Sequence, residues 1–66
     1  MTVTINDKTF DMPDNTTLEQ ALEIAHITTQ GIATALNNAV VPAAMRAKTT
    51  LVDGDKVTVI TAFYGG

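Results

Sequence analysis

The chain has 66 residues, a formal net charge of −3 and no cysteine. This length allows one small domain, and a chain this short buries only about 60% of its unfolded surface; without cysteine, disulfides and thiolate metal sites are excluded. The acidic balance argues against nucleic acid as a partner, because phosphate binding needs a basic face. The apolar runs are too short for a membrane span, and residues 1–5 lack a signal-peptide pattern. We therefore expect a soluble, cytoplasmic protein that binds neither nucleic acid nor membrane.

The N-terminal residues predict a β-hairpin. Residues 1–5 alternate apolar and threonine side chains, which is the period of a half-buried strand. Asn6-Asp7 is typical of a tight turn, and residues 8–12 form a second short strand with Phe10 and Met12 on one face.

A helix is predicted from Thr17 to Ala25 or His26. Thr16 followed by Glu19 is a capping-box pattern. One face of the helix is apolar at helical spacing, formed by Leu18, Ala21, Leu22 and Ala25.

A third strand is predicted over residues 32–36, followed by a hairpin turn at Asn37-Asn38. Ala33 and Ala35 on one side of this strand would allow a helix to approach closely, so its alternation leaves the buried face open. A short strand at Val40-Val41 ends at a proline, which cannot donate to a ladder.

The last third of the chain predicts a connection and then a final strand. Residues 43–50 are irregular or form a single helical turn, and Asp53-Gly54-Asp55 is a turn. The final strand runs from Lys56 to Ala62, with Val57 and Val59 on one face and Thr58 and Ile60 on the other.

This order of elements predicts an α+β domain over residues 1–66 with the β-grasp, or ubiquitin-like, architecture. We expect a mixed sheet of four to five strands with one main helix on one face. The N- and C-terminal strands are parallel central neighbours, and a flexible C-terminal tail occupies about residues 63–66.

Side chains inside the domain do not form a recognisable catalytic or metal-binding set. His26 has no partners at suitable spacing and suits the negative end of the helix dipole. Arg46 and Lys48 are interpreted as surface charges that can form a small basic rim. No serine occurs in the chain. We therefore expect a protein that is not an enzyme, binds no cofactor and has no metal site.

The C-terminal residues Phe63-Tyr64-Gly65-Gly66 offer a different kind of chemistry. The frayed end that is common in domains competes with a functional interpretation, in which glycines pass through a narrow channel and present a carboxylate. Attack of that carboxylate on the α-phosphate of ATP would give an acyl-adenylate, from which a sulfur nucleophile could displace AMP. Gly66 has no Cβ to crowd the acyl carbon.

The chain resembles the ThiS family of thiamine-pathway sulfur carriers over essentially its whole length. The resemblance rests on the order and spacing of several motifs, namely Thr16-Thr17-Leu18, Ala35-Leu36-Asn37-Asn38 with Val40-Val41-Pro42, Leu51-Val52-Asp53-Gly54-Asp55-Lys56-Val57, and Gly65-Gly66. Ala43 and Arg46 stand where many relatives have an arginine and a tryptophan, so the usual contacts of that loop are not carried over.

The resemblance implies a partner system around Gly66. A ThiF-like enzyme would use ATP to adenylate Gly66, a cysteine desulfurase system would supply sulfur, and the thiocarboxylate would donate it to a ThiG-like thiazole synthase. Gly65 would be needed for threading. Phe63, Tyr64 and Ile60 are candidate partner contacts, because aromatic anchors are common at interface hot spots and Ile60 lies on the sheet face opposite the helix.

Other functions use the same fold. The small subunit of molybdopterin synthase uses the same terminal chemistry with another acceptor, a ubiquitin-like modifier joins its terminus to lysines, and a β-grasp binding module uses no terminal chemistry.

Overall fold

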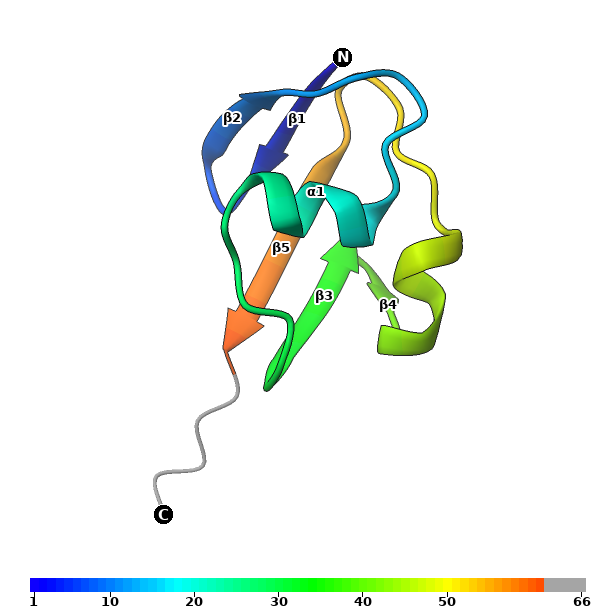
Figure 1. Cartoon of the computed structure of the whole chain (residues 1–66). Helices are drawn as coiled ribbons and strands as arrows, with labels where there is room; N and C mark the ends of the chain where they lie inside the picture. The colour runs from blue at the N-terminus through cyan, green and yellow to red at the C-terminus, as the bar shows by residue number, and fades with distance from the viewer. Residues whose placement is uncertain (62–66) are drawn as a thin grey trace.

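A single mixed sheet forms the body of the molecule (Figure 1). The computed structural model describes residues 1–61, so the predicted end of the last strand at Ala62 and the predicted tail at about residues 63–66 lie outside the described residues. Within the described part the sheet has five strands: β1 (Thr2–Ile5), β2 (Lys8–Asp11), β3 (Ile32–Leu36), β4 (Ala39–Val41) and β5 (Lys56–Thr61).

The strand order is β2-β1-β5-β3-β4, which puts β5 at the centre. It runs parallel to β1 and antiparallel to β3. The prediction of parallel N- and C-terminal neighbours is therefore confirmed, and so is the β-grasp architecture with one main helix.

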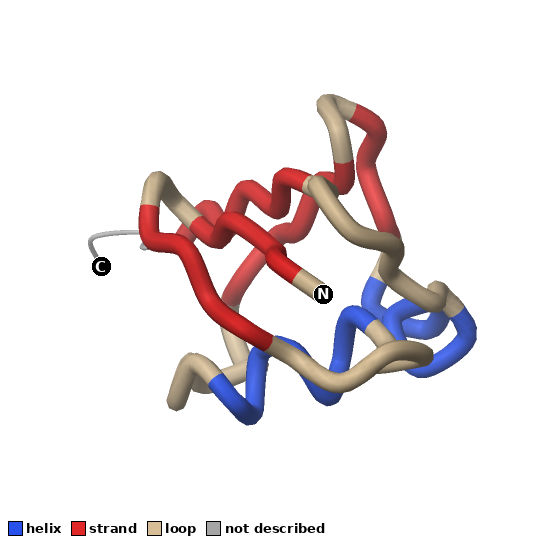
Figure 2. The backbone as a smooth tube through the Cα atoms, turned by 90° about the horizontal axis from the view of Figure 1, so that it is seen from above, coloured by secondary structure: helices blue, strands red, loops and turns tan. Residues whose placement is uncertain are grey.

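Two helices lie on the same side of the sheet (Figure 2). They are α1 (Leu18–Ile24) and the 3-10 helix η1 (Ala43–Lys48), which occupies most of the segment that was predicted to be irregular or a single helical turn. No helix within residues 1–61 is long and apolar enough to cross a membrane.

The helix begins one residue later than its capping pattern predicted. Thr17 is the N-cap: its hydroxyl accepts from the Gln20 N–H at 3.2 Å, and the Gln20 side chain accepts from the Thr17 N–H at 3.0 Å. Thr16 is buried and instead donates its hydroxyl to the Pro13 carbonyl at 2.7 Å. The predicted box of Thr16 and Glu19 is wrong because Thr16 is held by the preceding loop. The helix ends at Ile24, and the exposed His26 follows it with a φ of 58°.

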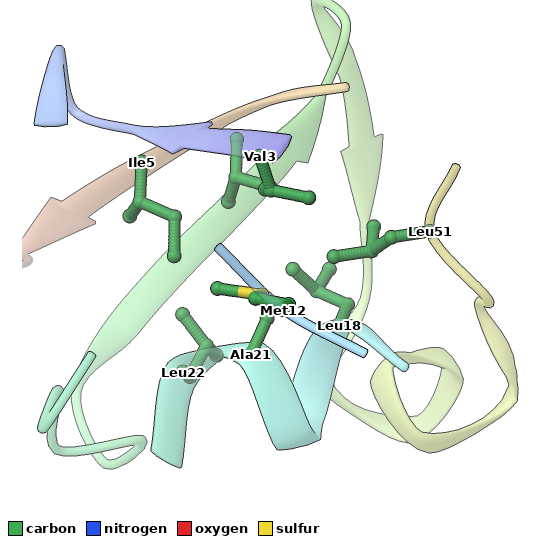
Figure 3. Close-up of a cluster of buried hydrophobic side chains, with 8 residues drawn as sticks. Val3, Ile5, Met12, Leu18, Ala21, Leu22 and Leu51 are labelled. Carbon is green, nitrogen blue, oxygen red and sulfur yellow. The ribbon is translucent and has the colours of Figure 1, made fainter. Parts of the chain in front are cut away.

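The core lies between the sheet and α1 (Figure 3). Side chains of β1 and α1 point toward one another, as the alternation of the first strand and the apolar stripe of the helix predicted. The buried apolar residues are Val3, Ile5, Met12, Leu18, Ala21, Leu22, Leu51 and Val57. With so small a core, single contacts weigh heavily on stability.

The structure decides which face of β3 is buried. Thr34 is buried, and Ile32 and Leu36 pack against the core. Ala33 and Ala35 point to the opposite face, so these small side chains do not receive the helix. They lie beside β5 instead, where Ala33 pairs with Ile60.

Candidate functional site

The candidate site is the C-terminal end of β5, where the central strand leads toward the terminal glycines. Gly66, Gly65, Tyr64 and Phe63 all lie outside the described residues. Ile60 is described, and 57% of its surface is exposed. The structure therefore describes the strand that precedes the predicted terminal site.

Pairing on both sides fixes β5 within the sheet. On one side Thr4 pairs with Lys56 and Ile5 with Val57. On the other, the ladder with β3 continues to the pair of Ile32 and Thr61. The end of β5 consequently lies beside the start of β3, at one end of the sheet (Figure 1).

The turn before β5 anchors the start of the strand. Asp53 accepts a hydrogen bond from the Thr2 N–H at 2.6 Å. Asp55 is only 7% exposed, and its carboxylate accepts from the Asn37 side chain at 3.0 Å and from the Val52 N–H at 2.8 Å. The sequence predicted this segment to be a turn, which is confirmed, and both carboxylates serve to hold it.

The Asn6 side chain holds β5 nearer its C-terminal end. Its Nδ2 donates to the Val59 carbonyl at 3.1 Å, and its Oδ1 accepts from the Val59 N–H at 2.8 Å. The sequence predicted only that Asn6 begins a turn, which its φ of 47° confirms. The only signal in the sequence for this contact with Val59 was that the turn residue is asparagine. A glycine would adopt the same backbone angle but has no side-chain amide.

The outer face of the sheet carries an apolar surface next to this end of β5. We call Ile60, Ala33, Ala35 and Val40 the outer patch. Ala33 pairs with Ile60, Ala35 pairs with Val40, and Val40 is 78% exposed. The predicted position of Ile60 opposite the helix is confirmed, while its contact with a partner stays a prediction.

Arg46 does not form a basic rim with Lys48, and that interpretation is wrong. Arg46 is 5% exposed, whereas Lys48 is exposed. The guanidinium donates to the Thr34 hydroxyl at 3.0 Å and to the carbonyls of Ile32 at 2.9 Å and Thr29 at 3.3 Å. Its planar fork matches these converging acceptors, so it ties η1 to β3 and to the loop before it.

Residues 1–61 contain no ligand-sized pocket and no group of three or more metal-ligating side chains.

Comparisons with known proteins agree with this fold. The model of the ThiS family matches residues 2–66. A crystal structure described as thiamine biosynthesis protein (ThiS) from Geobacter metallireducens superposes with a TM-score of 0.84 at 23% identity and covers 100% of both chains. A solution structure of a thiamine biosynthesis protein from the same organism gives a TM-score of 0.76 at 25% identity, covering 100% of this chain and 88% of that one. A search of curated protein sequences finds no significant match.

Proposed function

This chain belongs to the ThiS family, and we propose that it is a sulfur carrier of thiamine biosynthesis whose cargo is borne on the carboxylate of Gly66. The family match spans the terminal glycines as well as the folded body. The two structures of similar fold come from thiamine biosynthesis proteins. The observation that carries the proposal is that β5, the strand at the centre of the sheet, leads into the Gly65-Gly66 terminus.

The chemistry needs a partner enzyme to activate the terminus. A carboxylate oxygen of Gly66 attacks the α-phosphorus of ATP, the bond to the β-phosphate breaks, and pyrophosphate leaves. A hydrosulfide equivalent then attacks the acyl carbon and expels AMP, which leaves a thiocarboxylate. The chain has no cysteine, so it cannot hold sulfur as a persulfide and the terminus is the place for it.

Membership of the ThiS family implies three partners for this chemistry. A ThiF-like enzyme binds the ATP and adenylates Gly66, a cysteine desulfurase system supplies the sulfur, and a ThiG-like thiazole synthase accepts it. The carrier is a cosubstrate of these enzymes and not itself an enzyme. Gly65 keeps the approach to Gly66 narrow enough to thread into an active site.

The outer patch is the proposed docking surface for the activating enzyme. Ile60 is exposed on β5 shortly before the terminal residues, and the neighbouring residues of the patch on β3, Ala33 and Ala35, have small side chains. Phe63 and Tyr64 would add anchors between this surface and the glycines. An Ile60→Asp carrier is expected to fold normally and to raise KM for adenylation by about tenfold, the cost of losing one buried interface contact of about 1.4 kcal/mol. Normal KM for this variant would remove Ile60 from the interface.

The decisive experiment is intact-mass analysis after incubation with ATP and a ThiF-like enzyme. We expect an adenylate on the full chain and none on a variant that lacks Gly66. Adding the desulfurase system should convert the adenylate to a thiocarboxylate rather than an isopeptide product, which separates a carrier from a modifier. An acceptor assay then separates thiazole from molybdopterin synthesis. Failure of every cognate activating enzyme to form the adenylate would leave only a β-grasp binding module.

A further inference from the structure

Asn6 bonds to β5 as if it were another residue of β1. Its backbone N–H donates to the Val57 carbonyl at 3.0 Å. Its side-chain amide then pairs with both backbone groups of Val59, at 2.8 and 3.1 Å. A primary amide offers a donor and an acceptor in the same plane, as a peptide group does. The side chain thus continues the β1 ladder after the chain itself has turned away.

The position of this contact gives it a particular role. The β1 ladder ends at the pair of Ile5 and Val57, because Asn6 and Asp7 adopt φ values of 47° and 70° and reverse the chain. On its other side β5 stays paired as far as Thr61. Within residues 1–61, the Asn6 amide is therefore the last group to hold β5 from the β1 side.

The position at which β5 ends limits where the terminal carboxylate can reach. Residues 62–66 span at most about 17 Å, so a shift in the end of the strand shifts the region that Gly66 can reach by the same distance. Misplacement of about 1 Å can slow an enzymatic step by about a hundredfold. A change in the position of β5 at Val59 would thereby change where Gly66 can be delivered.

We propose that Asn6 is a positioning residue that aims the end of β5, and with it Gly66, at the active site of the adenylating enzyme. This role rests on the proposed function. It concerns delivery of the carboxylate and leaves docking through the outer patch unchanged, because Asn6 lies outside that patch. Loss of the Asn6 amide should consequently lower kcat for adenylation while KM stays the same.

The test compares Asn6→Gly with Asn38→Gly. Glycine accepts a positive φ without strain, so Asn6→Gly keeps the turn and removes only the amide. Asn38 also has a positive φ of 71° in a hairpin turn, and within residues 1–61 its side chain makes no hydrogen bond, which makes Asn38→Gly the matched control. Kinetics of adenylation by a ThiF-like enzyme and hydrogen exchange of the Val59 amide are measured on all three proteins at a temperature where each is folded.

The expected result is faster exchange at Val59 and a fall in kcat of about tenfold for Asn6→Gly only, with KM unchanged within about twofold. Faster exchange with normal kcat would show that the amide is merely structural and would overturn the proposal. An equal loss in Asn38→Gly would overturn it as well. If the wild-type carrier is not adenylated, the proposed function itself fails, and this role fails with it.

Discussion

The two hairpin turns of the sheet are built alike but contact different parts of β5. Asn6-Asp7 joins β1 to β2, and Asn37-Asn38 joins β3 to β4. All four residues have positive φ values, between 47° and 71°, as a two-residue turn of type I′ requires. In each turn the first asparagine donates its backbone N–H to β5 and adds two side-chain hydrogen bonds.

The turns differ in what those side chains bind. Asn37 donates to the buried carboxylate of Asp55 and accepts from the Lys56 N–H, at the start of β5. Asn6 bonds only to backbone groups of Val59, nearer the end of the strand and exposed to water. One turn therefore belongs to the polar network of the buried Asp55, whereas the hydrogen bonds of the other are exposed, and their loss should cost little stability.

The largest expected effect is at Asp55, the centre of the buried network. Asp55→Ala removes a carboxylate that accepts two hydrogen bonds, and we expect a loss of about 3 kcal/mol in the free energy of unfolding, or about 12–24 °C in Tm. Thermal unfolding followed by circular dichroism measures it. Asp53→Ala is the control, since Asp53 is exposed and should cost only about 0.5 kcal/mol. Equal losses at both sites would contradict a buried network at the start of β5.

The next prediction concerns the stability provided by Arg46. This buried side chain binds the carbonyl of Ile32, which pairs with Thr61 at the other end of the sheet. Arg46→Lys keeps a buried charge but loses the fork that reaches three acceptors, and we expect a loss of about 2 kcal/mol. Arg46→Met removes the charge as well and should cost only about 1 kcal/mol, because an apolar side chain escapes the desolvation penalty. Denaturant unfolding of both variants measures the order, and a more stable Lys variant would contradict it.

Asn37→Gly should destabilise more than Asn6→Gly, although each removes one turn amide. Without Asn37, a buried oxygen of Asp55 loses its side-chain donor, so we expect about 1.5 kcal/mol. Without Asn6, water can reach the Val59 groups, and the expected loss is about 0.5 kcal/mol. Chemical denaturation curves of the two variants compare them directly. A larger loss for Asn6→Gly would reverse the roles assigned to the turns.

Much of this arrangement could be predicted from the sequence, because local pattern determines it. The alternation in residues 1–5 indicates a strand, and the apolar stripe of residues 18–25 indicates a helix. The paired asparagines Asn37-Asn38 indicate a hairpin turn. Parallel pairing of the terminal strands followed from their apolar faces. These features together gave the β-grasp fold, its helix and the central position of β5.

The rest depended on contacts between residues far apart in the chain. Thr16 and Thr17 both satisfy a capping pattern, and the loop contact of Thr16 with Pro13 decides between them. Arg46 resembles any surface cation until β3 and the preceding loop supply its acceptors. The Asn6 amide reaches Val59 only because the topology places β1 beside β5. Periodicity carries no information on such pairings.

The smallest expected effect is at the second positions of the turns, Asp7 and Asn38, whose φ values are 70° and 71°. Glycine relieves the strain of a positive φ but adds entropy to the unfolded chain, so Asp7→Gly and Asn38→Gly should each change stability by less than about 0.5 kcal/mol. Alanine at either position should cost about 1 kcal/mol, because its Cβ opposes the left-handed backbone. Equal results at the two turns, measured by equilibrium unfolding, would place their difference at the first asparagine alone. Unequal results for the glycine variants would show that the second positions also distinguish the turns, and Asn38→Gly would then lose its value as a matched control for Asn6.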